Sequence, residues 1–455
     1  MEMGLDSADL LKLQIELEEA GQQKFKSGLF FEYNTAEKVI DFLAAELGVS
    51  SEVEAEGVLP AAENAIGSQS KDIAIIGISC KLPGGIENPE QLWQLLLEER
   101  DAISQYPKNR GYWPEADDKP AIDLGGFIQG ADEFDADFFR IPPIEAGAAD
   151  PQQRILLQLA WGCLEDACIK PEDIKNSNTG VFVGASNSDY SRLLQDAKLE
   201  TQAHHATGGS LAVIANRLSY FFDLNGPSLV VDTACSASLV ALHVAMQSLN
   251  SGECGTALVG GVNLICHPDL SLGYHKAGML SPDGLCKVFD AGANGYVRSE
   301  GAVMMMLKPL ERALEDKDQI HAVLKGSASN HGGLAGGLTV PNPKKQSELL
   351  TRAWKNAGIS AQELDYLEAH GTGTSLGDPI EIQGMQSAFN QAGQTVSEGS
   401  CGVGSVKSNL GHLESAAGLT GLLKVVLSMR HNQVPASIHY SRLNPKIQLQ
   451  GSPLY

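Results

Sequence analysis

Cys235 lies where a strand is expected to turn into a helix. The apolar run 228–231 is typical of a buried strand, and the Ala- and Leu-rich run 239–246 is typical of a buried helix. Free N–H groups and the positive end of a helix dipole stabilise an anion, so we expect a lowered pKa for this thiol and a thiolate that attacks acyl groups. Serine nucleophiles use the same kind of turn. A buried cysteine acting as a small apolar residue is the alternative interpretation.

Two histidines also follow the ends of expected strands. His370 follows the expected strand 364–369 and opens the run Gly-Thr-Gly-Thr, and His412 ends the loop after the expected strand 401–407. Open α/β folds bind ligands at the carboxyl ends of their strands. A single histidine in such a loop is often structural. Two of them together with Cys235 favour one catalytic site.

The composition argues against several other functions. The chain has 33 basic and 56 acidic residues and a net charge of -23, which disfavours a nucleic-acid partner and an anionic membrane surface. It contains no apolar run of transmembrane length and no opening signal peptide. The eight cysteines show no CxxC pairing, and the eleven histidines do not cluster with cysteines. We therefore expect a cytoplasmic protein with reduced thiols and no metal site.

The elements that must position these residues alternate between strands and helices from residue 71 onward. This pattern predicts an α/β fold with a largely parallel or mixed sheet that is covered on both faces. The expected strands are 72–78, 179–184, 228–231, 257–262, 302–307, 322–327, 364–369 and 401–407. The expected helices are 89–99, a long one from 150, 211–224, 239–246, 346–358 and 414–429.

The three candidate residues lie in motifs that resemble those of β-ketoacyl synthases, most closely the ketosynthase domains of modular polyketide synthases. The motifs, in order, are Asp232-Thr-Ala-Cys235-Ser-Ala-Ser, Glu368-Ala-His370-Gly-Thr-Gly-Thr374 and Lys407-Ser-Asn-Leu-Gly-His412. The resemblance covers nearly all of residues 71–455. It implies a thiolase-like layered fold of two related halves, which is usually homodimeric.

The resemblance also implies a decarboxylative Claisen condensation. Cys235 would hold the growing acyl chain as a thioester, and His370 and His412 would stabilise the enolate formed from a carrier-bound malonyl unit. Thr372 and Thr374 would contact the pantetheine arm of the carrier.

Lys407 and Glu414 match supporting positions of the family, with a surface salt bridge or a helix cap as the alternative interpretation. Three other functions stay open at this point. They are a non-elongating ketosynthase that only transfers acyl chains between carriers, a non-enzymatic scaffold and a cysteine hydrolase.

Residues 1–46 are expected to form a short all-α segment, since Leu10, Leu13 and Leu17 share one face of a helix. Gly4-Leu-Asp-Ser7 and the helices after it resemble the last part of an acyl carrier protein. This implies a covalent 4′-phosphopantetheine on Ser7, with a simple helix N-cap as the alternative. Residues 47–70 have the composition of a flexible linker.

The ketosynthase family continues beyond the position of residue 455. We therefore expect 71–455 to lack its final C-terminal segment, and the whole sequence to be a fragment of a larger multidomain protein. Its expected partners are acyl carrier domains upstream and downstream and an acyltransferase, in cis or in trans.

Overall fold

A six-stranded mixed sheet organises the part of the chain that the computed structural model describes. The described residues are 72–455, apart from 111–112, 114–119, 199, 201, 336–339 and 394–395. The predicted carrier segment 1–46, including Ser7, and the predicted linker 47–70 lie outside the described residues. None of the helices described within 72–455 is long and apolar enough to cross a membrane.

The strand order of the sheet is β5-β4-β6-β7-β1-β8. β4 runs parallel to β5 and β6, whereas β7 is antiparallel to β6 and β1, and β1 is antiparallel to β8. The parallel trio therefore brings three carboxyl ends to the same edge. The strands are β1 (Ile73–Lys81), β4 (Thr179–Gly184), β5 (Ser228–Val231), β6 (Thr256–Asn263), β7 (Gly301–Pro309) and β8 (Ala322–Leu324).

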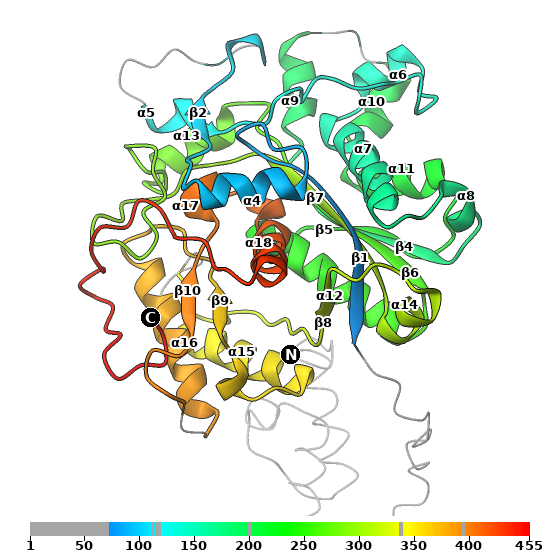
Figure 1. The fold of residues 1–455 in the computed structure, drawn as a ribbon. Coiled ribbons are helices and arrows are strands. Elements are labelled where there is room, and N and C mark those ends of the chain that lie inside the picture. Colours follow the sequence, from blue (N-terminus) through cyan, green and yellow to red (C-terminus); the bar gives the residue numbers. More distant parts are fainter. Residues whose placement is uncertain are drawn as a thin grey trace, which may run out of the picture. The chain divides into compact units, whose positions relative to one another are not determined.

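Helices cover both faces of this sheet (Figure 1). Successive side chains of a strand point to opposite faces, so Ile73 and Ile75 of β1 lie in one apolar core and Ala74 and Ile76 lie in the other. The first core is shared with α4 (Pro89–Leu97), α12 (Ala237–Asn250) and α18 (Ala417–His431), and the second with α7 (Pro151–Asp166) and α11 (Leu211–Phe222).

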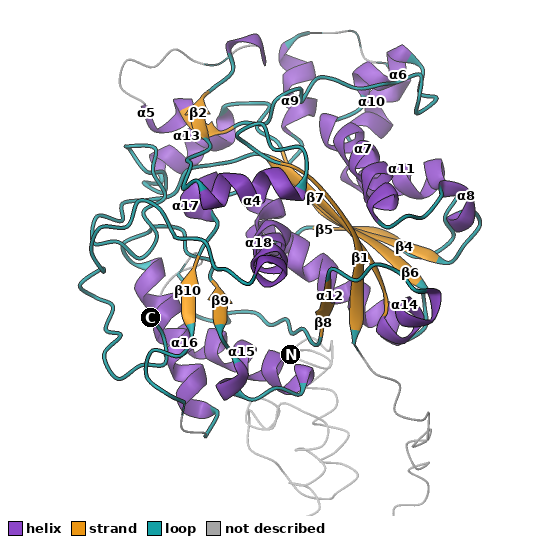
Figure 2. Ribbon diagram, viewed as in Figure 1, coloured by secondary structure: helices purple, strands orange, loops and turns teal. Residues whose placement is uncertain are grey.

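The C-terminal part of the chain contains a second, smaller α/β unit (Figure 2). Its two strands, β9 (Tyr366–Glu368) and β10 (Gly402–Gly404), are parallel. The helices α15 (Pro343–Ala357) and α16 (Gly377–Gln391) supply much of its core, which contains Trp354 and Phe389.

Shorter elements connect these layers. They are β2 (Ile103–Gln105), β3 (Leu124–Gly126), α5 (Pro120–Asp123), α6 (Pro143–Ala148), α8 (Pro171–Ile174), α9 (Asp189–Asp196), α10 (Ala203–Gly208), α13 (Asp269–Lys276), α14 (Leu310–Asp316), α17 (Lys407–Leu410) and the 3-10 helices η1 (Lys108–Arg110), η2 (Ala234–Ser236), η3 (Ala361–Glu363) and η4 (Glu414–Ala416).

The expected mixed α/β architecture is confirmed, with differences at the ends of elements. The expected strand 401–407 ends at Gly404, and Lys407 instead begins the single-turn helix α17. The reason is a side-chain hydrogen bond. The carboxylate of Glu368 in β9 accepts the N–H of Val406, and the chain leaves the strand there. The expected helix 414–429 begins with η4 and continues as α18 from Ala417.

Candidate active site

Cys235 lies in η2, between the end of β5 and the start of α12. The residue before it, Ala234, has a φ of 52°, a left-handed conformation that is costly for a residue with a side chain. Asp232 accepts the N–H of Ala234 through its carboxylate at 3.1 Å and supports this turn. The sharp strand-to-helix turn predicted from the sequence is therefore present, and it presents Cys235 at the sheet edge.

The start of α12 packs unusually close to the sheet because two glycines lie under it. A Cβ on Gly184 of β4 would overlap the backbone nitrogen of Ser238, and a Cβ on Gly261 of β6 would overlap the side chain of Ser238. Ser238 in turn accepts the N–H of Leu419 in α18 through its hydroxyl. These contacts fix the first turn of α12, and with it the position of Cys235.

His370 follows β9 and is held through its backbone. The carboxylate of Glu381 in α16 accepts the N–H of His370 at 2.6 Å and that of Gly371 at 2.8 Å. Asp378, three residues earlier on α16, accepts the N–H groups of Gly373 and Thr374. The loop that carries His370 is thus attached to α16 along its whole length.

His412 follows α17 and is fixed on both its backbone and its ring. Its N–H donates to the carbonyl of Val297 at 2.7 Å. Its Nδ1 accepts the N–H of Glu414 at 3.0 Å. The ring of Tyr296 packs edge-on against the imidazole, with 5.2 Å between centroids. This environment leaves Nε2 as the free nitrogen of His412.

The fold brings the three predicted residues together. One ligand atom from each of Cys235, His370 and His412 lies within 4.8 Å of the other two. The two imidazoles are nearly perpendicular, with centroids 5.2 Å apart. All three residues line one cavity of about 1060 Å³, which is large enough for a long flexible substrate.

This grouping corrects the expectation that no histidine clusters with a cysteine, since folding assembles such a cluster from distant segments. The hydrogen bonding nevertheless disfavours a metal ion there. Because Nδ1 of His412 accepts a backbone N–H, the neutral ring carries its proton on Nε2. A metal-binding imidazole needs a free lone pair, and its other nitrogen normally donates a hydrogen bond. The ring is therefore arranged to donate a hydrogen bond into the cavity.

The histidines are neutral at physiological pH. His370 keeps an accessible surface in the cavity, but the protein atoms around its imidazole remove much of its solvation and lower its pKa to about 3, and the Lys407 ammonium acts in the same direction. Burial likewise lowers the pKa of His412 well below its usual range, with added repulsion from Lys407 and His370. Neutral imidazoles that each carry one N–H suit hydrogen-bond donation to a developing oxyanion.

The expectation of a lowered pKa for Cys235 is wrong. Protein atoms surround the thiol on most sides although it keeps an accessible surface in the cavity, and this loss of solvation raises its pKa above the usual thiol value. The Lys407 ammonium and a backbone N–H act in the opposite direction and limit the rise. Burial outweighs the helix N-terminus at this site.

Lys407 lies behind the three residues as a buried cation. Burial lowers its pKa, whereas the carboxylates of Glu368 and Glu381 favour its charged form. Its charge also acts on Cys235, His370 and His412, as described above. Lys407 is therefore a buried residue close to the site and not an exposed one in a surface salt bridge, and its supporting role stays a prediction.

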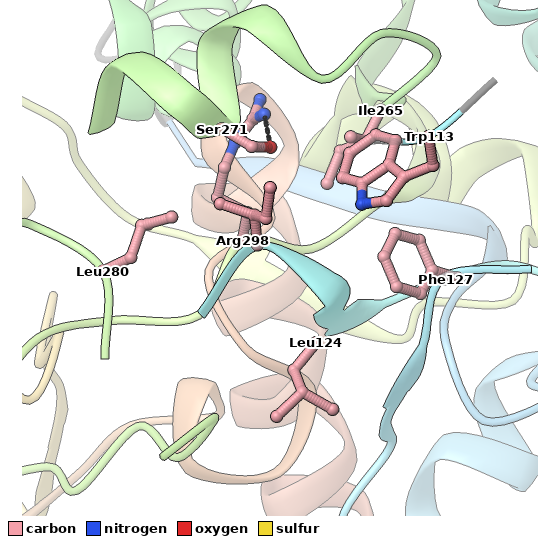
Figure 3. Close-up of a pocket in the computed structure, with 8 residues that line it drawn as sticks. Trp113, Leu124, Phe127, Ile265, Ser271, Leu280 and Arg298 are labelled. Carbon is pink, nitrogen blue, oxygen red and sulfur yellow. Dashed lines mark hydrogen bonds between the residues drawn. The ribbon is translucent and has the colours of Figure 1, made fainter. Parts of the chain in front are cut away.

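Glu414 also lines the cavity and is not a surface residue. Its carboxylate binds Arg298 through two hydrogen bonds, of 2.5 and 3.0 Å. The Arg298 side chain is 3% exposed and that of Glu414 is 17% exposed. Arg298 also donates to the hydroxyl of Ser271, and both residues line a small cavity (Figure 3). That cavity measures about 10 Å³, enough for one water molecule but for no substrate.

Thr372 and Thr374 line the large cavity together with His370. Thr372 is buried, and its hydroxyl lies 3.3 Å from that of Thr374. The hydroxyl of Thr374 also accepts the N–H of Gly377 at the start of α16. Both residues therefore line the cavity that holds Cys235, and their contact with a pantetheine arm stays a prediction.

The interpretation of the sequence gave no individual role to five residues that support the site. These are Asp378, Glu381 and Arg298, together with the buried pair of Glu368 and Lys424, which lie 2.9 Å apart. Their signal in the sequence was a run of charged residues next to the expected strand ends, in Gly377-Asp-Pro-Ile-Glu381 and in Val297-Arg-Ser-Glu300. Carboxylates in such positions can accept backbone N–H groups of the catalytic loops, as Asp378 and Glu381 do.

The chain matches known families over most of its length. Residues 70–313 match the N-terminal domain of β-ketoacyl synthases, and residues 321–441 match the C-terminal domain of the same enzymes. The chain belongs to the β-ketoacyl synthase family. It is an enzyme of the acyltransferase class, of the type found in polyketide synthases.

The relatives are multidomain polyketide synthases. Polyketide synthase PksM of Bacillus subtilis is 41% identical over 100% of this chain, and erythronolide synthase EryA2 of Saccharopolyspora erythraea is 40% identical over 99%. The ketosynthase spans only 11% and 13% of the lengths of these two relatives.

Solved ketosynthases share the fold. The ketosynthase from module 6 of the bacillaene synthase of Bacillus subtilis has a TM-score of 0.78 at 38% identity, over 84% of this chain and 66% of that one. The oxazolomycin ketosynthase domain OzmH KS7 of Streptomyces albus has a TM-score of 0.80 at 42% identity, over 84% and 68%. The thiolase-like fold is therefore established, whereas the carrier segment at 1–46 stays a prediction.

Proposed function

We propose that this ketosynthase extends a polyketide chain by decarboxylative condensation of an acyl thioester on Cys235 with a carrier-bound malonyl unit. The observation that carries the proposal is the convergence of Cys235, His370 and His412 within 4.8 Å at one large cavity. A thiol beside two neutral imidazoles fits a nucleophile and two hydrogen-bond donors.

In the first half-reaction the Cys235 sulfur attacks the acyl thioester of an upstream carrier. The new C–S bond forms on Cys235, the carrier C–S bond breaks, and the carrier thiol leaves with the proton of the cysteine. Lys407 lowers the cost of the thiolate through its positive charge. This step converts a thioester on the carrier into a thioester of similar energy on Cys235, so the reaction needs no energy source.

In the second half-reaction the malonyl thioester loses carbon dioxide, and the bonding electrons pass to an enolate. Nε2–H of His412 and the ring N–H of His370 would donate to the enolate oxygen. The enolate carbon attacks the acyl carbon on Cys235, the C–S bond to Cys235 breaks, and the leaving thiolate takes up a proton from solvent. The product is a β-ketoacyl chain, two carbons longer, on the downstream carrier, and Cys235 is free again.

The pantetheine arm would enter along Thr372 and Thr374. Their hydroxyls and the backbone of the glycine-rich loop suit the amide groups of such an arm. The proposal includes the partners expected from the sequence, namely carriers on both sides, a carrier segment modified with 4′-phosphopantetheine at Ser7, and an acyltransferase in cis or in trans. A cytoplasmic location belongs to the same proposal.

We also propose that the protein works as a homodimer. β5 is the outermost strand of the described sheet and pairs only with β4 there. The segment 232–236 that follows it, which includes Cys235, is exposed in the single chain. A free strand edge next to a nucleophile favours pairing with a second copy, which would close the site.

The test uses the full-length synthase module. An acyl thioester is added, the mass of the intact protein is followed, and malonyl-loaded carrier is then supplied. We expect the acyl mass on wild-type protein, none on Cys235→Ala, and a β-ketoacyl product on the carrier. Acylation of Cys235→Ala would remove the nucleophile assignment. Acylation of the wild type without extension would favour a ketosynthase that only transfers chains, the alternative function for this site.

A further inference from the structure

We propose that two carboxylates on α16 position the two ends of the loop 370–374 for separate tasks. Glu381 positions His370 for the decarboxylation and condensation steps, and Asp378 positions Thr372 and Thr374 for the pantetheine arm. Both are positioning residues that act through the backbone of the loop. The inference rests on the proposed function, because it assigns a different step of that function to each end.

The Glu381 end of the loop is held by two short hydrogen bonds. One carboxylate oxygen accepts the N–H of His370, and the other accepts the N–H of Gly371. Both carboxylate oxygens accept a hydrogen bond, so the carboxylate cannot rotate or shift without losing at least one of the two bonds. The carboxylate also favours the charged form of Lys407. Glu381 therefore fixes the backbone from which the imidazole of His370 projects.

The Asp378 end is held in the same way by a different side chain. One carboxylate oxygen accepts the N–H groups of Gly373 and Thr374, at 3.1 and 3.3 Å. The other accepts the N–H of Phe289 at 2.8 Å, which attaches the loop to a neighbouring segment. Asp378 is 1% exposed and lies in the first turn of α16, where the helix dipole favours a negative charge.

The two ends can respond separately because the chain turns at two glycines between them. Gly371 has a φ of 41° and Gly373 a φ of 77°, so the loop turns sharply on both sides of Thr372. Loss of one anchor would then displace its own end of the loop more than the other end. His370 acts on the reacting atoms, whereas the threonines contact the arm that delivers them.

Glu381→Gln and Asp378→Asn test the inference in the full-length module. Each substitution keeps the shape of the side chain but turns one acceptor oxygen into an N–H donor. For Glu381→Gln we expect kcat of condensation to fall about 10- to 100-fold, because the hydrogen-bond donor to the enolate is misplaced, with KM for the malonyl carrier and the rate of Cys235 acylation within about 3-fold. For Asp378→Asn we expect KM to rise about 10-fold, with kcat within about 3-fold.

Glu348→Gln on α15 is the matched control, because its carboxylate forms a salt bridge with the partly exposed Lys345 three residues away. We expect wild-type kinetics from this variant. If both α16 variants show the same fall in kcat and the same rise in KM, together with lowered melting temperatures, the two residues have a merely structural role and the inference is overturned. Unchanged kinetics in both variants would also overturn it. If Glu381→Gln does not fold, Glu381→Asp takes its place, and we expect the same result from it, a fall in kcat with a nearly unchanged KM. A wild-type module that never acylates Cys235 would instead overturn the proposed function.

Discussion

The backbone N–H of Glu414 donates a hydrogen bond to Nδ1 of His412 over 3.0 Å. The chain thereby uses the main chain of one cavity residue to set the proton position on another. With Nδ1 occupied as an acceptor, the proton of the neutral imidazole lies on Nε2. A histidine that is both neutral and fixed in this tautomer acts as a hydrogen-bond donor over a wide range of pH.

The first prediction concerns the pH dependence of the condensation step. His370 and His412 have pKa values below the usual value, and for His370 the value is about 3. Neutral imidazole is the form present above the pKa, so His370 stays neutral from pH 8 down to pH 5, and His412 is still neutral at the pH where an ordinary histidine titrates. We expect single-turnover condensation by protein already acylated on Cys235 to show no inflection near pH 6.5. An acidic limb centred near that value would contradict neutral histidines.

The second prediction concerns the charge of Lys407. Its ammonium favours the thiolate of Cys235, so Lys407→Met should raise the pKa of the thiol. The thiolate fraction at pH 8 then falls, and we expect alkylation of Cys235 by iodoacetamide to slow by roughly 3- to 10-fold, since one pKa unit corresponds to a factor of ten. Peptide mass spectrometry measures the rate. The exposed Cys168 in the same sample is the internal control and should react at an unchanged rate.

The third prediction concerns the stability contributed by a buried ion pair. Glu414→Leu leaves the nearly buried guanidinium of Arg298 without its bidentate partner. We expect the free energy of unfolding to fall by about 3 kcal/mol in chemical denaturation. The control is Arg192→Ala, which breaks a pair with Asp269 whose side chains are 53% and 50% exposed and should cost less than about 1 kcal/mol. Equal losses in the two variants would mean that burial of the pair is unimportant.

The fourth prediction concerns the close packing of α12 on the sheet. Gly184→Ala places a methyl group against the backbone of Ser238, so the first turn of α12 must move. We expect a loss of about 1–3 kcal/mol in unfolding free energy and slower acylation of Cys235. Gly273→Ala in α13 is the matched control, because nothing lies within 4 Å of its new methyl group and alanine favours a helix. Wild-type stability in Gly184→Ala would show that the helix can shift freely.

The sequence predicted the main layers because strand and helix patterns are local. β4 and β5 have the predicted bounds, and the turn at Cys235 follows from an apolar run that ends in small residues. The convergence of Cys235 with two histidines could be expected, because open α/β folds bind ligands at the carboxyl ends of their strands. Its distances could not, since they depend on how two separate sheets pack.

Other features needed long-range information. The pKa of Cys235 was predicted in the wrong direction, because a helix N-terminus is visible in the sequence whereas the atoms that desolvate the thiol come from distant segments. The pairing of Arg298 with Glu414 joins residues 116 positions apart. The roles of Asp378 and Glu381 depend on their partners, which are backbone N–H groups that the sequence does not single out.

The anchoring of the loop 370–374 has a consequence for how such an enzyme can change. Asp378 and Glu381 grip only main-chain atoms of that loop. Thr372 can therefore be exchanged, and with it the preference for a carrier arm, while α16 still sets the path of the loop and the place of His370. Thr374 is less free to change, because its hydroxyl accepts the N–H of Gly377 in α16. The preference for a carrier arm can therefore change at this part of the cavity while the residues that carry out the reaction stay in place.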